Sequence, residues 1–233
     1  MIAKQCARQW NQEGATNFIL IGRNAERLNF IAQDLLVRNL KSTVEIQEAD
    51  FSNPDNIQKL ADQLFLHGPI DIALIAHGSL PDQTESQNNL SLCKETLEIN
   101  GISPCLYAEA FAEHMAKLDH GSIAVIGSVA GDRGRKSNYI YGAAKGLVAR
   151  YTQGLQHRFA GTGVNISLIK PGPTDTPMTA GMKGSFAPAE EVARIITSGI
   201  NQKRKIIYAP KKWWLIMMII RHLPSVIFNK LNI

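Results

Sequence analysis

The chain has 233 residues, of which 45% are hydrophobic and 19% charged, values typical of a globular protein with a sizeable core. Its net charge of +5 is due to residues 192–233, which hold eight basic residues and no acidic one. No stretch reaches the roughly 18 apolar residues of a membrane span, and residues 1–6 have no apolar signal region. Cys6, Cys93 and Cys105 are odd in number and lack metal-ligand spacing. We therefore expect free thiols in a reducing, cytoplasmic compartment, and no metal site.

Strand-type and helix-type patterns alternate along the chain. Short apolar runs predict strands at 18–21, 43–47, 70–76, 122–126, 164–169 and 205–208. Apolar periodicity predicts helices at 2–12, 25–38, after Pro54, from about 90 past Asn100 towards Met115, from Tyr141 to about 160, and at 187–200. Apolar strands separated by helices indicate a parallel sheet covered on both faces, a doubly wound α/β fold. We expect a single domain over residues 1–210, followed by an apolar and basic helical tail over 211–233.

Unusual residues collect where the predicted strands end. These are Gly22-Arg23, Asp50-Phe51, His77-Gly78, Gly127-Ser128 and Pro171-Gly172. Each pair alone is also what an ordinary turn between a strand and a helix would show. Because ligands bind beyond the carboxyl ends of parallel strands, the five together predict a binding edge.

The stretch from Ser128 to Lys145 holds residues suited to proton transfer. Tyr141 and Lys145 are four positions apart and share a helix face, so we expect the ammonium to lower the pKa of the phenol. A serine hydroxyl brought to the same point would hydrogen-bond the oxygen that is protonated. The pattern predicts a site that interconverts an alcohol and a carbonyl. By itself, the pair also fits a helix with a packed tyrosine and a solvated lysine.

With these residues, the chain resembles the short-chain dehydrogenase/reductase family over residues 1–210. The matching marks are the Ser128 to Tyr141 spacing, Tyr141 with Lys145, Pro171-Gly172 followed by Thr174, Asp50 after a strand, and Asn100 inside a helix. The resemblance implies a Rossmann-type sheet, a bound nicotinamide cofactor and a Ser-Tyr-Lys-Asn constellation.

The resemblance also implies a role for each catalytic residue. Tyr141 would be the general acid in the reductive direction, and Lys145 would lower its pKa and hold the nicotinamide ribose. Ser128 would orient the substrate oxygen. Asn100 would support a water that links Lys145 to solvent, although a polar residue that only kinks the helix remains the alternative.

The cofactor-binding residues follow from the same resemblance. Thr174 would contact the nicotinamide amide, and Ala76, His77 and Gly78 stand where the family usually has Asn-Asn-Ala-Gly. The side-chain role of His77 stays open between a core and a surface histidine, and we do not assign it to catalysis. The full predicted set is Arg23, Asn24, Asp50, Phe51, Ala76, His77, Gly78, Tyr141, Lys145, Pro171, Gly172 and Thr174.

Arg23 indicates which nicotinamide cofactor is preferred. An acidic residue at this place would accept hydrogen bonds from the ribose of NAD, whereas an arginine pairs with the 2′-phosphate of NADP. Residues 22–24 include no aspartate. We therefore expect NADP(H) to be preferred over NAD(H), although a solvated turn arginine would look the same in the sequence.

The sequence departs from the family at its start. The family opens with an apolar strand and a glycine-rich turn that cradles the pyrophosphate, whereas residues 1–3 already lie in or next to the helix that follows. Without that central strand, two unpaired strand edges would face each other inside the sheet. We expect the biological start to lie roughly 10–15 residues upstream. The rival interpretation is a short form that cannot hold the cofactor.

The tail combines basic residues with an apolar run. Lys211-Lys212 precede eight consecutive apolar residues, 213–220. Such a segment suits contact with an anionic membrane surface. It also suits a helix that docks on a partner subunit, one that closes over the substrate pocket, or a plain core element. Nucleic acid is not expected to bind, because no reader motif accompanies the basic residues.

Two function classes follow from these observations. The first is an NADPH-dependent reductase that converts a ketone to a secondary alcohol, acting as a homo-dimer or homo-tetramer in the cytoplasm, with possible attachment to the membrane's cytoplasmic face. Its substrate would be a small-molecule ketone, a 3-oxoacyl thioester, or a lipid-linked keto sugar, because the tail and residues 76–81 resemble the family branch that acts on polyprenyl-phosphate sugars. The second class is a non-catalytic Rossmann-like binding or scaffold protein.

Overall fold

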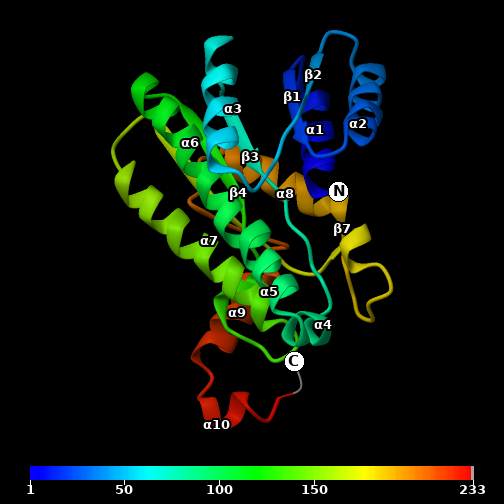
Figure 1. Ribbon diagram of the computed structural model, residues 1–233, viewed down its shortest axis with the longest axis vertical. Coiled ribbons are helices and arrows are strands. Elements are labelled where there is room, and N and C mark those ends of the chain that lie inside the picture. Colours follow the sequence, from blue (N-terminus) through cyan, green and yellow to red (C-terminus); the bar gives the residue numbers. More distant parts are fainter. Residues whose placement is uncertain (232–233) are drawn as a thin grey trace.

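Helices and strands alternate along the computed structural model, which describes residues 1–231 (Figure 1). The side chains of Asn24 and Asn53 cap the helices that follow them, and Gly14 ends the first helix. The helices are α1 (Ile2–Glu13), α2 (Ala25–Arg38), α3 (Pro54–Leu66), α4 (Gln83–Asn88), α5 (Leu90–Leu97), α6 (Ser103–Leu118), α7 (Tyr139–Arg158), α8 (Ala189–Asn201), α9 (Lys212–His222) and α10 (Ser225–Phe228). The strands are β1 (Asn17–Gly22), β2 (Thr43–Glu48), β3 (Ile72–Ile75), β4 (Gly121–Ile126), β5 (Val164–Pro171), β6 (Thr174–Asp175), β7 (Ala187–Pro188) and β8 (Ile206–Ala209). Three shorter helical turns are η1 (Glu98–Ile102), η2 (Val129–Asp132) and η3 (Pro177–Thr179).

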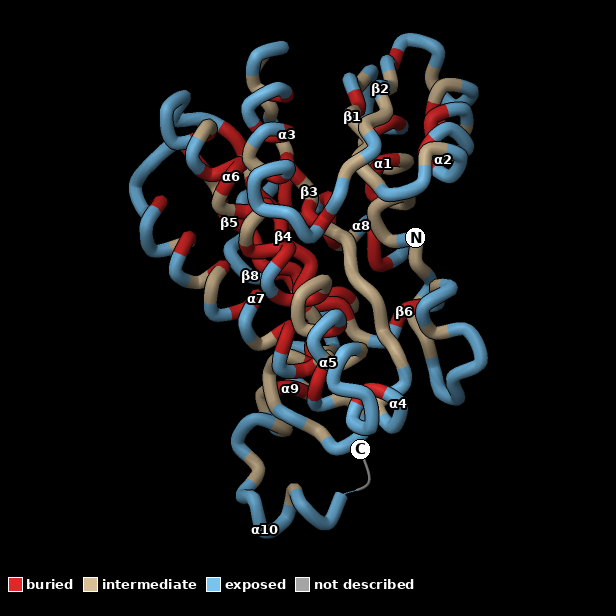
Figure 2. The backbone as a smooth tube through the Cα atoms, viewed as in Figure 1, coloured by how far each residue is buried: buried red, intermediate tan, exposed pale blue. Residues whose placement is uncertain are grey.

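The main sheet has four parallel strands in the order β3-β4-β5-β8. Alternate residues of β4 serve opposite faces, as expected for a pleated strand. Ile123 and Val125 belong to the core formed with α3, α6 and α7, whereas Ala124 and Ile126 belong to the core formed with α1 and α8. Buried segments run through β4 and β5, between these two layers of helices (Figure 2). The predicted doubly wound α/β fold is confirmed.

Strands β1 and β2 form a separate parallel pair rather than extending the main sheet. Within residues 1–231, β1 pairs only with β2, and β3 pairs only with β4. In Figure 1, the β1–β2 pair stands apart from β3, together with α1 and α2. The apolar residues Ile19, Leu20 and Ile21 are only partly buried, which is unusual for a strand of this apolar character. The structure therefore has two facing strand edges without hydrogen-bonded partners.

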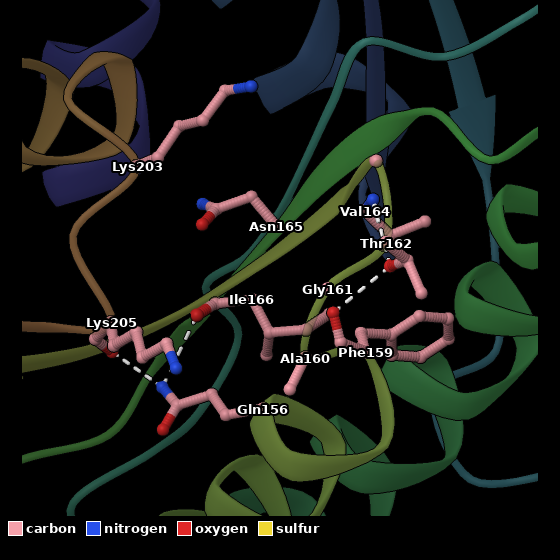
Figure 3. A pocket seen from close by; sticks show the side chains of 11 residues that line it. Gln156, Phe159, Ala160, Gly161, Thr162, Val164, Asn165, Ile166, Lys203 and Lys205 are labelled. Atoms are coloured by element: carbon pink, nitrogen blue, oxygen red, sulfur yellow. Dashed lines mark hydrogen bonds between the residues drawn. The ribbon is translucent and has the colours of Figure 1, made fainter.

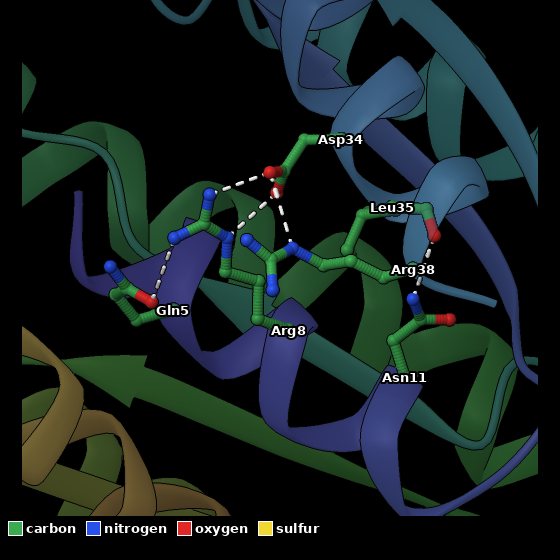
Figure 4. Close-up of polar contacts among 6 residues, drawn as sticks. All are labelled: Gln5, Arg8, Asn11, Asp34, Leu35 and Arg38. Carbon is green, nitrogen blue, oxygen red and sulfur yellow. Dashed lines mark hydrogen bonds and ion pairs between the residues drawn. The ribbon is translucent and has the colours of Figure 1, made fainter.

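Helix α1 joins the β1–β2 pair to the main sheet. On one side it packs against α8, and on the other it contacts α2. Arg8 donates two hydrogen bonds to Asp34 of α2, at 2.7 and 2.6 Å, and lowers the pKa of that carboxyl to about 2 (Figure 4). The buried Asn11 donates to the Leu35 carbonyl at 2.8 Å and accepts from Ser42 Oγ at 2.6 Å. These contacts position β1, and hence Arg23 at its end.

The C-terminal segment is helical, as predicted, and packs partly on the body of the same chain. Helix α9 contacts β8 and η2. Its Met217 is fully buried, and Trp213 lies directly against Gly172. No helix within residues 1–231 is long and apolar enough to cross a bilayer. The tail is thus part core element and part exposed surface.

Candidate active site

The predicted serine and tyrosine lie on two elements that pack backbone to backbone. Ser128 follows β4 by two residues and caps η2, its hydroxyl accepting a hydrogen bond from the Ala130 N–H at 3.1 Å. A Cβ on Gly131 would come within 2.6 Å of the Lys145 backbone, and one on Gly142 within 3.0 Å of the Ala130 carbonyl oxygen. Only glycine permits such an approach, so η2 can lie against the first turns of α7. This contact brings Ser128 to Tyr141.

The Asn100 side chain links the loop after β3 to helix α5 by hydrogen bonds. It is fully buried in η1, a π-helical turn between α5 and α6. Its Oδ1 accepts from the Ser79 N–H at 2.9 Å, and its Nδ2 donates to the Thr96 carbonyl at 3.0 Å. A Cβ on Gly78 would lie 2.6 Å from Asn100 Oδ1 and 3.7 Å from Lys145 Nζ, which places all three residues together. The α-helical hydrogen-bond pattern is interrupted at Asn100 by this π-helical turn, so a helix-kinking role and a site role are both open. Turns of this kind often occur at functional sites.

The pKa of Tyr141 differs from the sequence-based expectation. Burial raises it to about 12, and the Ser128 hydroxyl offsets only part of that effect. Lys145 is 3% exposed, and burial lowers its pKa to about 8. Its Nζ donates to the Ile126 carbonyl at 3.0 Å and lies 5.8 Å from the centre of the Tyr141 ring. The expected lowering of the tyrosine pKa is therefore wrong for the protein alone, because desolvation outweighs the distant ammonium.

His77 is a stacked, neutral histidine. Its ring lies 4.4 Å from that of Phe51, and its Nε2 lies 2.8 Å from Ser103 Oγ. Burial, with the charges of Lys145 and Arg23, lowers the pKa of His77 to about 3. Phe51 is itself 8% exposed and also contacts Tyr107. The rings of Phe51 and His77 thus pack together at the loop after β3.

The neutral state of His77 predicts a loss of stability in acid. Below pH 6.5, His77 binds a proton in the unfolded chain but stays neutral in the folded protein. Each further pH unit therefore lowers the free energy of unfolding by up to about 1.4 kcal/mol, until about pH 3. Urea unfolding between pH 7 and pH 4 should show this slope in the wild type and a smaller one in His77→Asn. His67→Asn, a change at an exposed histidine, is the control. Equal slopes in the wild type and His77→Asn would refute the assignment.

The residues predicted to hold the cofactor line the carboxyl edges of both sheets. Arg23 is exposed after β1, and its guanidinium has no hydrogen bond or ion pair within residues 1–231. Asp50 is exposed, and hydrogen bonds from Ser52 lower its pKa. Asn24, by contrast, uses its side-chain oxygen to cap α2, accepting from the Arg27 N–H at 2.8 Å. Its side chain is therefore committed to the helix start.

The loop after β5 is held by internal contacts. Pro171 and Thr174 are buried, and the Thr174 hydroxyl donates to the Gly172 carbonyl at 2.9 Å. Gly172 is pressed against Trp213. The loop is thereby fixed beside the end of β4, the strand that pairs with β5. The cofactor roles assigned to these residues stay predictions.

A buried ion pair next to Ser128 was not found from the sequence. Lys170 at the end of β5 pairs with Asp132 of η2, and their side chains are 5% and 4% exposed. Tyr208 of β8 donates to the same carboxylate at 3.0 Å. These residues are 38 and 76 positions apart from Asp132, so no local spacing links them. Lys170 and Tyr208 lie near the carboxyl ends of β5 and β8, and this position is the only sequence signal that could have linked them.

Two pockets lie outside this constellation. The pocket in Figure 3, of about 210 Å³, lies at the opposite end of β5 from Ser128 and contains none of the predicted site residues. A second, of about 470 Å³, lies between the start of α1 and the segment after Thr174 and is lined by Met1, Gln5 and Thr176. The positive end of the α1 dipole therefore points to the edge that holds Thr174.

Comparison with known proteins places this constellation in a family. The sequence matches the short chain dehydrogenase family over residues 2–184. The chain belongs to the short chain dehydrogenase family. It is 32% identical over 181 residues to an uncharacterized oxidoreductase of Staphylococcus epidermidis, covering 77% of this chain and 76% of that protein. It is 27% identical over 224 residues to one of Mycobacterium tuberculosis, covering 94% and 88%.

Solved structures of short chain dehydrogenases show the same fold. The bulky-bulky ketone specific alcohol dehydrogenase from Comamonas testosteroni superposes with a TM-score of 0.78 at 21% identity, covering 99% of this chain and 90% of that one. The actinorhodin polyketide ketoreductase, solved with NADPH, also gives 0.78, at 19% identity and with 89% and 90% covered. These structures show the shared fold, whereas the family match and the oxidoreductase relatives show that the protein is an oxidoreductase of the short-chain type.

Proposed function

We propose that this short-chain oxidoreductase reduces a ketone to a secondary alcohol and uses NADPH as the hydride donor. The observation that carries the proposal is the convergence of Ser128, Tyr141, Lys145 and Asn100 at the carboxyl edge of one parallel sheet. A ketone-specific alcohol dehydrogenase and a polyketide ketoreductase among the related folds support the same substrate class.

The protonation states of the pair suit the reductive direction. With a pKa of about 12, Tyr141 keeps its proton at neutral pH and can donate it to a substrate oxygen. The Ser128 hydroxyl, at the end of β4, would orient that oxygen toward the phenol. Lys145, with a pKa of about 8, remains largely charged at neutral pH and would stabilise the phenolate left behind. Asn100, beside Lys145, would hold the route by which the proton is replaced.

The residues present fit the two ends of a nicotinamide dinucleotide. Arg23 and Asp50 offer a cation and an acceptor for the adenosine ribose, both on exposed residues. Lys145, Tyr141 and Thr174 would hold the nicotinamide end. When bound, the dinucleotide supplies the hydride. Residues 1–3 contain no glycine, so they do not offer the pyrophosphate a glycine-rich turn.

Arg23 should make NADPH bind at least about tenfold more tightly than NADH, because an arginine adds a charge-assisted contact to the 2′-phosphate. Fluorescence titration of each cofactor measures the preference. Arg23→Ala should remove most of it by weakening NADPH, while Arg27→Ala, at an exposed position on α2, should leave it unchanged. Equal dissociation constants in the wild type would refute NADPH preference, and failure of both cofactors to bind would favour the non-catalytic alternative.

A screen of ketones for NADPH oxidation should include apolar and lipid-linked substrates. The polyprenyl-phosphate keto sugars are one such class, supported by the tail and by residues 76–81. Bulky hydrophobic ketones and 3-oxoacyl thioesters are the others. The four proposed catalytic residues would contact only the carbonyl group of the substrate. The rate of NADPH oxidation with each ketone therefore has to identify the substrate class.

A further inference from the structure

Helix α9 is apolar on all sides, although only one side is covered by protein. Its inner face, which includes Trp213 and Met217, packs on the body. Its outer face carries Trp214, Leu215 and Ile219, which are 54%, 58% and 57% exposed. A helix that is hydrophobic all round is normally buried on all sides. The exposed apolar outer face of α9 therefore indicates a surface that binds something other than water.

Helix α10 extends the same exposed surface. Val226 and Ile227 are 74% and 51% exposed. In Figures 1 and 2, α9 and α10 lie at the end of the molecule farthest from the β1–β2 pair, and α10 projects beyond the body. We define the tail face as the exposed residues Trp214, Leu215, Ile219, Val226 and Ile227.

Basic residues border the tail face, and no acidic residue occurs in the last 42 positions of the chain, 192–233. Lys211 and Lys212 precede it, Arg221 lies in the last turn of α9, and Lys230 follows it, all four being exposed. Lys211, Leu215 and Ile219 are spaced by four positions and share one stripe of the helix. Apolar residues framed by cations match a bilayer surface that presents acyl chains beneath anionic headgroups.

The tail face is held rigidly to the body beside the candidate site. The Arg133 guanidinium donates to the carbonyls of Ile220 and Leu223, both at 2.6 Å, at the end of α9. The same guanidinium lies 3.7 Å from the centre of the Phe228 ring in α10. Arg133 directly follows η2, which Ser128 caps. The orientation of α9 and α10 is therefore fixed relative to Ser128.

We propose that the tail face docks the protein on an anionic membrane surface, with its apolar side chains at the level of the headgroups and its lysines paired with anionic lipid. Charge complementarity selects this occupant over a second copy of the chain, whose identical basic border would repel it. The docking does not depend on the proposed reductase chemistry. Circular dichroism in solution therefore serves as an independent check of folding for every variant.

Co-sedimentation of the full chain with vesicles tests the proposal. Phosphatidylcholine vesicles that contain about one third phosphatidylglycerol should bind the wild type, and pure phosphatidylcholine vesicles should bind it much more weakly. Lys211→Gln with Lys212→Gln should weaken binding about 25-fold, at about fivefold for each lysine. Leu215→Ser with Ile219→Ser should weaken it at least about tenfold. The matched control is Leu40→Ser with Leu66→Ser, which removes two leucines 89% and 84% exposed elsewhere and should bind like the wild type.

Three results would overturn membrane docking. The first is a wild type that stays in solution with anionic vesicles, and the second is tail-face variants that bind vesicles as well as the wild type does. The third is that neither the wild type nor Leu215→Ser with Ile219→Ser binds vesicles, while analytical ultracentrifugation shows that this double substitution converts a dimer to a monomer. That result would assign the tail face to a second copy of the chain.

Discussion

Replacing Tyr141 by phenylalanine should lower kcat for ketone reduction about 1,000-fold and leave the dissociation constant of NADPH within about threefold of the wild type. The substitution removes one hydroxyl from a partly buried ring and keeps the ring itself, so packing against η2 is preserved. Without the phenol, the group proposed to deliver a proton to the carbonyl oxygen is missing. Steady-state NADPH oxidation and fluorescence titration measure the two quantities.

Tyr139→Phe is the matched control for this experiment. Tyr139 lies two positions earlier on the same helix and is 45% exposed. Losing its hydroxyl should change neither kcat nor NADPH binding. Full activity in Tyr141→Phe would show that the proton comes from elsewhere and would overturn the assigned mechanism.

Replacing Asp132 by asparagine should lower the free energy of unfolding by about 3–5 kcal/mol. The change leaves the Lys170 ammonium, 5% exposed, without its counter-charge in a dry site between η2 and β8. For a chain of this length, the loss corresponds to a fall in Tm of roughly 6–20 °C. Urea unfolding monitored by circular dichroism gives the free energy, and a thermal scan gives Tm.

Two further variants separate the buried charge from its surroundings. Asp132→Leu combined with Lys170→Met replaces the pair with apolar groups and should restore most of the lost stability. Glu113→Gln breaks an exposed pair with Lys117, whose side chains are 51% and 65% exposed, and should cost less than about 1 kcal/mol. If Asp132→Asn costs no more than Glu113→Gln, the pair contributes nothing as a buried interaction.

The elements of the fold follow from local patterns, and their assembly does not. Helix α2 begins and ends at the predicted residues because Asn24 caps it and its apolar residues repeat at helical spacing. Strands β1 and β3 share no hydrogen bonds within residues 1–231. The expectation of two facing edges came from the family resemblance, because periodicity does not report which strands pair. Helix α4 was not predicted, because its six polar residues carry no apolar stripe.

The sequence predicted the individual residues of the candidate site. It did not predict the properties that depend on tertiary contacts between residues. Ser128, Tyr141, Lys145 and Asn100 stand at recognisable spacings, and the structure brings them together. The tyrosine pKa was predicted with the wrong sign, because the sequence shows the neighbouring lysine and not the depth of burial. The Asp132–Lys170 pair depends on tertiary contact alone.

The most direct test of the proposed chemistry follows the hydride itself. The protein is supplied with NADPH carrying deuterium at the transferable position of the nicotinamide and with ketones from the bulky hydrophobic class. We expect an alcohol that bears the deuterium on its carbinol carbon, formed by the wild type and not by Tyr141→Phe. An alcohol without deuterium, or equal formation of the labelled alcohol by both proteins, would contradict the proposed chemistry.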